Sequence, residues 1–349
     1  MVKIDSEQII KALSSVMDPE IGKDLIQLNM IRDIKIEDFK VTFTLVLTTP
    51  ACPLRNKIEV DARQAVLGVK GVSQVEIKID SNVPHGARLP DMFELPIKHI
   101  IAVASGKGGV GKSTIAVNLS VALAQSGAKV GLLDADFYGP NIPMMMGIKG
   151  LPVQNNKQKM IPGEAYGIKV MSTGFLVKEG QPLIWRGPLL HSAIKQFLSD
   201  VEWGNLDYLV IDLPPGTGDV QLSLAQTISI SGGIIVTMPQ EVSLGDAGRA
   251  LEMFIKLGIP VLGIIENMGF LTLPDGKEMN VFGEGGGVKL ADKYCVPFLG
   301  TIELFPAIRE GGDTGKPIMV LNPDSKPSKE IRRMAGEIAA KLSVAVMKS

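Results

Sequence analysis

The chain has 349 residues, of which 45% are hydrophobic and 21% charged, so it is long and apolar enough for two folded domains. Its 36 Lys and Arg residues balance 37 Asp and Glu residues, which excludes an overall basic charge, and nucleic acid is not an expected partner. Two cysteines exclude a disulfide framework, and no run reaches the ~18 apolar residues of a membrane span, so we expect a cytoplasmic protein with no membrane partner.

Residues 1–80 predict a small α+β domain in the order αββαβ. The strand over 40–48 alternates, with Val41, Phe43, Leu45 and Leu47 on one face. The other expected elements are a helix over 5–16 capped by Asp5 or Ser6, a strand over 31–37, a helix over 53–67 opened by Pro53, and a strand over 72–79.

Residues 81–96 carry three prolines among polar residues and predict a linker. The pattern then changes, and short runs rich in Val and Ile alternate with helical segments over residues 97–349. Such runs are typical of parallel strands buried on both faces, so the expected fold class is α/β. The runs are 99–104, 129–134, 208–212, 233–238 and 261–266, and an amphipathic helix over 328–345 ends the chain.

A glycine-rich loop follows the first of these strands and precedes a helix over 114–125. The loop is Gly106-Lys107-Gly108-Gly109-Val110-Gly111-Lys112-Ser113-Thr114, which satisfies G-x-x-x-x-G-K-[ST] in the strand–loop–helix context that this motif needs. Backbone N–H groups would converge on phosphate oxygens, Lys112 would reach the β- and γ-phosphates, and the Ser113 hydroxyl would coordinate Mg²⁺. This predicts a P-loop NTPase domain.

Carboxylates and one amide follow other strands of the same sheet. Asp134 and Asp136 lie at the end of one strand, and Asp212 ends another in the Walker B pattern. Asp136 is the candidate that orients the attacking water and senses Mg²⁺, Asp134 would hold the loop, and Asp212 would bind Mg²⁺ through water. Pro214–Asp219 predicts a glycine-hinged loop that senses the γ-phosphate. Asn267 could pair with the adenine edge, or it could be a turn-forming asparagine.

The loop resembles the deviant Walker A motif, K-G-G-x-G-K-[ST], because Lys107 directly follows its first glycine. The resemblance implies that Lys107 crosses a homodimer interface to the partner's nucleotide, as an arginine finger does. The whole chain resembles the Mrp/ApbC-type ATPases, the iron–sulfur cluster carrier family, with a small α+β module ahead of the ATPase. The matching motifs are Ala104–Thr114, Leu133–Asn141, Trp185–Pro188, Asp212–Asp219, Glu266–Met268, Phe282–Gly287, Asp18–Glu20 and Thr49–Pro53.

This resemblance implies a homodimer that binds two ATP molecules and transfers an iron–sulfur cluster to apo-proteins. Family members that carry a cluster usually have a Cys-x-x-Cys ahead of the Phe-Gly segment, but residues 269–281 contain no cysteine. Cys52 precedes a predicted helix start, which would lower its thiol pKa and make it a candidate iron ligand; a small residue packed at a turn is the alternative. Cys295 is expected in the core.

Three functions are compatible with these features. The first is a Mg²⁺-dependent, dimer-gated ATPase that assists iron–sulfur cluster assembly or transfer, with apo-proteins or assembly factors as partners. The second is a nucleotide-switched regulator without a cluster, which acts on a partner protein or DNA. The third is a small-molecule kinase. The sequence contains no motif for a second substrate, and Lys107 favours hydrolysis instead. Lys107, Lys112 and Asp136 are the expected catalytic residues.

Overall fold

The computed structural model describes residues 4–86, 95–150, 153–155, 159–175 and 187–348. The chain divides into two units. One comprises the residues up to Pro84 together with those from Gly336 onward, and the other comprises His85–Ala335. The last helix, α11 (Lys326–Lys348), therefore begins in the larger unit and ends in the smaller one. The prediction assigned all of residues 97–349 to the larger domain, because a periodic apolar pattern does not tell which core it faces.

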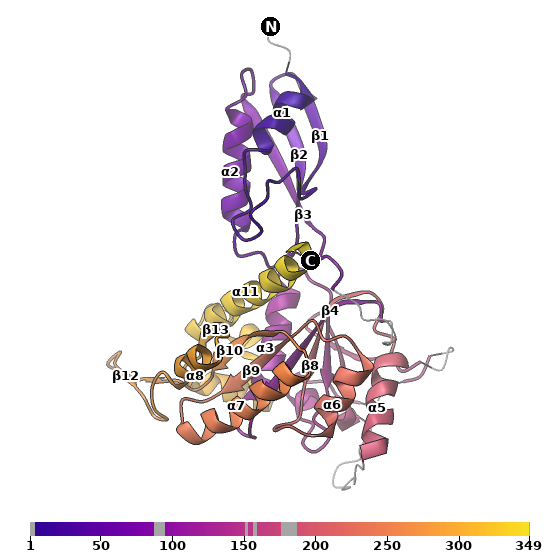
Figure 1. Cartoon of the computed structure of the whole chain (residues 1–349), viewed down its shortest axis with the longest axis vertical. Coiled ribbons are helices and arrows are strands. Elements are labelled where there is room, and N and C mark those ends of the chain that lie inside the picture. Colours follow the sequence, from indigo (N-terminus) through magenta and orange to yellow (C-terminus); the bar gives the residue numbers. More distant parts are fainter. Residues whose placement is uncertain (1–3, 87–94, 151–152, 156–158, 176–186, 349) are drawn as a thin grey trace. The chain divides into compact units, whose positions relative to one another are not determined.

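The smaller unit contains a three-stranded sheet with two helices packed on it (Figure 1). Strand β1 (Ile31–Glu37) pairs antiparallel with β2 (Lys40–Leu47), and β2 pairs parallel with β3 (Gln74–Ser81). The helices are α1 (Ser6–Leu13) and α2 (Arg55–Leu67). The order αββαβ is the predicted one, and the parallel β2–β3 pair follows from the helix that connects these strands.

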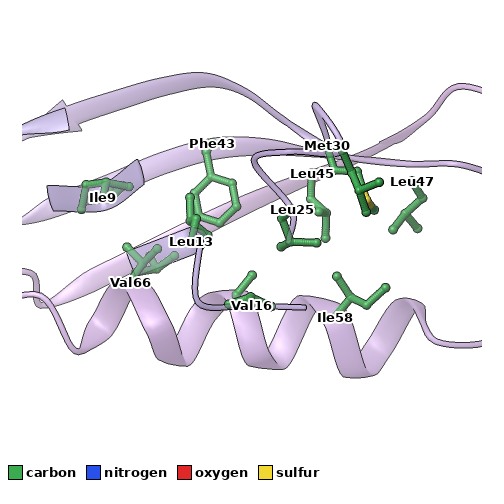
Figure 2. Close-up of a cluster of buried hydrophobic side chains, with 14 of the residues drawn as sticks. Ile9, Leu13, Val16, Leu25, Met30, Phe43, Leu45, Leu47, Ile58 and Val66 are labelled. Carbon is green, nitrogen blue, oxygen red and sulfur yellow. The ribbon is translucent and has the colours of Figure 1, made fainter. Parts of the chain in front are cut away.

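One apolar core joins the sheet and both helices of this unit (Figure 2). Val41, Phe43, Leu45 and Leu47, which the alternation placed on one strand face, are all at most 1% exposed. The helices contribute Ile9, Leu13, Ile58 and Val66. Val344 and Met347 of α11 pack against the same core, which is why the end of the chain groups with this unit.

Two helix boundaries in this unit differ from the prediction. Helix α1 ends at Leu13 rather than 16, because the Ser14 and Ser15 hydroxyls donate to backbone carbonyls three residues earlier and compete with the next turn. Helix α2 begins at Arg55 with Leu54 as its N-cap, so Pro53 precedes the helix instead of opening it. Asp5 caps α1 in a capping box with Gln8, as one of the two predicted caps.

The larger unit contains an eight-stranded sheet in the order β13-β10-β9-β4-β8-β5-β7-β6, parallel except for the β6–β7 pair. This confirms the α/β fold class. The strands are β4 (Ile97–Ser105), β5 (Val130–Asp134), β6 (Gly163–Ala165), β7 (Ile168–Ser172), β8 (Leu206–Asp212), β9 (Gly232–Thr237), β10 (Val261–Glu266) and β13 (Phe298–Thr301). The pattern predicted five of them and missed β6, β7 and β13, none of which is longer than five residues.

Helices cover both faces of this sheet; in Figure 1, α6 and α7 lie in front of it and α3 behind it. The helices are α3 (Lys112–Gln125), α4 (Ile142–Met145), α5 (Gly187–Ser199), α6 (Asp219–Thr227), α7 (Glu241–Lys256), α8 (Gly286–Tyr294), α9 (Pro306–Thr314) and α10 (Ile318–Leu321), with a 3₁₀ turn at Thr173–Phe175. A hairpin of β11 (Leu271–Thr272) and β12 (Glu278–Met279) follows β10. Among the described helices, none combines the length and the apolar content that crossing a bilayer requires.

The parallel strands bring the chemistry-bearing residues to one edge of the sheet. The P-loop follows β4, Asp134 ends β5, Asp212 ends β8, and Asn267 follows β10. Asp134 and Asp212 lie opposite each other in the β5–β8 register. Because the carboxyl ends of parallel strands meet at the same edge, residues more than a hundred positions apart become neighbours here.

Candidate nucleotide site

The phosphate-binding loop joins β4 to α3, and three of its glycines have conformational or steric reasons to be glycine. Gly109 and Gly111 adopt positive φ, at 80° and 84°, and Gly111 is the N-cap of α3. A Cβ on Gly111 would overlap the side-chain amide of Asn267, and one on Gly106 would overlap the backbone of Asp246 in α7. The loop is thus packed between β10 and α7 with its backbone amides at the start of a helix.

Lys112 sits at the centre of this loop and is paired with carboxylates. Its ammonium lies 2.6 Å from Asp212 Oδ1 and 3.8 Å from Asp136 Oδ2, and it is 6% exposed. It also donates to Ser113 Oγ at 3.3 Å. Three of the predicted catalytic and Mg²⁺-binding residues therefore meet at one lysine. A triphosphate in the loop would compete with Asp212 for the same ammonium, because both are anions.

Asp212 is the buried member of this group. It is 1% exposed, and burial raises its carboxyl pKa while the Lys112 ammonium opposes the rise. Its Oδ2 atom is buried and has no hydrogen-bond partner among the described residues. A carboxylate oxygen left without a partner fits a cation or a cation-bound water, as the Walker B pattern predicts. No group of three His, Cys, Asp or Glu side chains in the described ranges could hold a metal by itself, so Mg²⁺ would also need oxygens from Ser113, phosphate and water.

Asp134 holds the loop that carries Asp136. Its carboxylate accepts hydrogen bonds from the backbone N–H of Asp136 at 3.1 Å and of Ile142 at 3.3 Å, and from the Ser172 hydroxyl at 2.8 Å. Burial, together with the neighbouring Asp212 carboxylate, raises the pKa of Asp134 to about 8. These bonds agree with the loop-holding role assigned to Asp134, and they leave Asp136 at the cavity wall.

A cavity of about 510 Å³ extends from the phosphate loop. Of the predicted binding residues, its lining includes Lys107, Gly108, Gly109, Gly111, Lys112, Ser113, Thr114, Asp136 and Asn267. Gly106, Val110 and Asp212 lie outside this lining; Gly106 packs on α7, Val110 is 2% exposed and Asp212 is 1% exposed. The volume falls in the range of small-molecule sites.

One part of the cavity lining was not predicted from the sequence. It comprises Met144 and Met145 of α4 and the segment Leu304-Phe305 with Ile308 and Arg309 of α9. These residues give part of the cavity an apolar lining. No motif marks them in the sequence, although Pro306 at the first turn of α9 signals the start of that helix.

Asn267 supports the phosphate loop from outside it, whereas Lys107 belongs to the loop and lines the cavity. The Asn267 Nδ2 donates to the Val110 carbonyl at 2.9 Å, so the amide supports the phosphate loop, and pairing with adenine stays a prediction that would use its oxygen. Lys107 lines the cavity, half-buried, and its backbone carbonyl accepts the Ser105 hydroxyl at 2.9 Å. Within the described ranges its ammonium has no carboxylate within ion-pair distance. Its role across a dimer interface stays a prediction.

The acidity of Cys52 and the exposure of Cys295 both differ from the predictions. Cys52 lies in the smaller unit and is half-buried; burial, with smaller contributions from Glu20 and Asp18, raises the pKa of its thiol to about 11. The expected lowering is wrong, because α2 starts three residues later and desolvation outweighs two backbone hydrogen bonds. Cys295 was expected in the core but is exposed, at the left-handed C-cap of α8.

Comparisons with known proteins agree with this geometry. The family described as NUBPL iron-transfer P-loop NTPase matches residues 96–339, and the family described as iron-sulfur cluster assembly protein matches residues 6–79. An iron-sulfur cluster carrier protein of Synechocystis is 50% identical over 99% of both chains, and one of Deinococcus radiodurans is 47% identical over 97% of this chain and 96% of its own.

Solved structures of related proteins match the larger part of the chain. A nucleotide-binding protein of Archaeoglobus fulgidus, in complex with ADP and with cobalt found, is 40% identical with a TM-score of 0.57, over 66% of this chain and 90% of its own. The cell division ATPase MinD of Pyrococcus furiosus is 26% identical with a TM-score of 0.52, over 69% and 98%. These matches confirm the resemblance drawn from the motifs: the chain belongs to the NUBPL iron-transfer P-loop NTPase family.

Proposed function

We propose that this protein is a Mg²⁺-dependent homodimeric ATPase that assists the assembly of iron–sulfur clusters or their transfer to apo-proteins. The observation that carries the ATPase part is Lys112, which pairs with Asp212 and Asp136 and lines a cavity of about 510 Å³. The iron–sulfur part is supported by the relatives named iron-sulfur cluster carrier protein, which match the chain from end to end. Free thiols support a cytoplasmic location.

Phosphate binding follows from the loop. Backbone amides at the start of α3 and the Lys112 ammonium would hold the β- and γ-phosphates, and Lys112 would exchange its contact with Asp212 for one with phosphate. Ser113 and Asp212 would hold Mg²⁺, which would neutralise charge on the phosphates. Asp212 Oδ2, buried and without a partner in the described ranges, is suited to that role.

Hydrolysis needs an oriented water and a further positive charge. Asp136, with a side chain 14% exposed at the cavity wall, would orient the water toward the γ-phosphorus. Lys107 of one subunit would stabilise the charge that develops on the other subunit's nucleotide. The half-buried position of Lys107 on the cavity, with no ion pair in the described part of the chain, supports such a role.

Phosphate release measured with purified protein, ATP and Mg²⁺ tests the ATPase part. We expect Lys112→Ala to abolish turnover, and Lys107→Ala to lower kcat with ATP binding retained. Lys256→Ala, at an exposed lysine in the last turn of α7, is the matched control and should behave as wild type. An unchanged kcat in Lys107→Ala would refute the trans-lysine role, and a wild-type protein without ATP turnover would refute the ATPase proposal.

The cluster would be cargo, and its ligands remain to be identified. The β11–β12 hairpin spans the stretch where the resemblance implies Cys-x-x-Cys, and it contains no cysteine. Cys52 is therefore the thiol to test. Iron and acid-labile sulfide are measured after anaerobic purification and after reconstitution, in wild type and Cys52→Ser. Iron retained by wild type and lost in Cys52→Ser would support ligation by Cys52, and transfer to an apo-acceptor would support the carrier function.

A nucleotide-switched regulator without a cluster is the second candidate. The β11–β12 hairpin favours this function, because it contains no cysteine where the resemblance implies Cys-x-x-Cys. A colourless protein that hydrolyses ATP and transfers no cluster would favour this function. DNA binding is then measured at increasing salt concentration. Contacts with phosphates make DNA affinity fall as salt rises, so an affinity that is weak and independent of salt would exclude DNA as the partner.

A further inference from the structure

A buried glutamine on α6 makes hydrogen bonds to the loop that follows β8. The Gln221 side chain is 1% exposed, and its Nε2 donates to the Pro214 carbonyl at 2.9 Å and to the Gly216 carbonyl at 3.0 Å. Its Oε1 accepts the Gly218 backbone N–H at 3.0 Å. One side chain thus makes three hydrogen bonds to a five-residue loop. Both N–H groups and the oxygen of the amide are used, which no other side chain of similar size can reproduce.

The loop held by Gln221 is bonded in turn to the phosphate loop. The Gly216 N–H donates to the Ser105 carbonyl at 2.9 Å, and the Ser105 hydroxyl donates to the Lys107 carbonyl at 2.9 Å. Gly216 has φ of 87°, a left-handed conformation that glycine adopts without strain. A continuous series of hydrogen bonds therefore leads from Gln221 to the backbone of Lys107.

The same loop also borders Asp136. Pro215 and Asp136 both line the nucleotide cavity, and both line a second cavity of about 540 Å³ that Gln221 also lines. Gln221 is not part of the nucleotide cavity's lining. A change at Gln221 would therefore disturb a loop that reaches the nucleotide cavity at Pro215, without removing a residue of that cavity's lining.

We propose that Gln221 is a positioning residue for ATP hydrolysis, which holds residues 214–218 so that Asp136 keeps its place beside its own subunit's nucleotide and Lys107 keeps its place toward the partner's nucleotide. The inference rests on the ATPase activity proposed above. It assigns to Gln221 a role in kcat and not in ATP binding, because the three hydrogen bonds determine where the loop lies and leave the phosphate cradle of Lys112 and Ser113 intact.

The test compares three variants with wild type. Gln221→Leu keeps most of the side-chain volume and removes all three hydrogen bonds, whereas Gln221→Glu keeps an acceptor for Gly218 and loses both donors. Gln226→Leu makes the same chemical change at an exposed position of the same helix and is the control. We expect kcat to fall about tenfold in both Gln221 variants, with KM for ATP within about twofold of wild type, and no change in Gln226→Leu.

Hydrogen exchange separates positioning from loss of folding. We expect the Gly218 and Gly216 amides to exchange faster in Gln221→Leu, while amides of strands β4 and β8 keep their wild-type protection. Wild-type kcat in Gln221→Leu, a rise in KM at unchanged kcat, an equal loss in Gln226→Leu, or unchanged Gly218 exchange would each overturn the inference. ATP turnover by wild type together with any of these results leaves the proposed function standing, whereas no turnover by wild type refutes both.

Discussion

The thiol of Cys52 offers a quantitative test of how burial controls reactivity in the smaller unit. Burial raises its pKa from 9.0 to about 11, and the Glu20 and Asp18 carboxylates contribute in the same direction. At pH 8 the thiolate fraction would be about one in a thousand, compared with about one in ten for an unshifted thiol. Since the thiolate is the reacting species, alkylation of Cys52 should be about a hundredfold slower than alkylation of an unshifted thiol.

The assay is the rate of iodoacetamide alkylation as a function of pH, measured on Cys295→Ser so that Cys52 is the only thiol. Cys52→Ser reports the exposed Cys295 for comparison. The Cys52 rate should rise about tenfold per pH unit through pH 9, without a plateau. Glu20→Gln removes one carboxylate and should raise the rate at any fixed pH. A plateau near pH 8, or a Cys52 rate equal to that of Cys295, would refute the effect of burial.

The same shift has a consequence for stability. In the folded protein the thiol keeps its proton up to about pH 11, whereas the unfolded chain releases it near pH 9.0. The unfolded state therefore binds fewer protons between these values, and the free energy of unfolding falls as pH rises through this window. Circular dichroism at each pH should accompany the alkylation rates, so that reactivity gained by unfolding is not attributed to the native thiol.

Two further predictions concern packing. Gly106→Ala places a Cβ against the backbone of Asp246 and should lower the free energy of unfolding by about 1–3 kcal/mol. Gly108→Ala is the control, because nothing lies within 4 Å of the added carbon, and its thermal midpoint should equal that of wild type. Equal midpoints for the two variants would contradict the close approach of Gly106 to Asp246. Ser343→Ala removes a hydrogen bond of 3.1 Å to the Thr48 carbonyl and should destabilise the smaller unit by about 1 kcal/mol in a urea titration; a wild-type midpoint would show that this contact does not hold the last helix.

The sequence could predict the P-loop fold and the place of the phosphate loop because that signal is local, whereas the roles of its residues stay predictions. The P-loop is a contiguous run between a strand and a helix, and the parallel strands bring Asp134, Asp212 and Asn267 to the same edge without further information. The cavity lining from α4, α9 and residues 304–305, and the role of Gln221, could not be predicted in the same way. Glutamine in a helix is usually a solvated residue, and only the path of the loop around α6 turns Gln221 into a buried amide with three partners.

Sequence alone determined the fold class, the order of elements in the smaller unit, the phosphate loop and the family, because periodic apolar patterns and contiguous motifs are properties of neighbouring residues. Tertiary structure alone decided the acidity of Cys52, the exposure of Cys295 and the grouping of the residues after Gly336 with the smaller unit. Each of these depends on residues that are far apart in the chain, such as Glu20 near Cys52, or Val344 packed against the core of the smaller unit. Desolvation and packing are set by those distant neighbours, which no local pattern encodes.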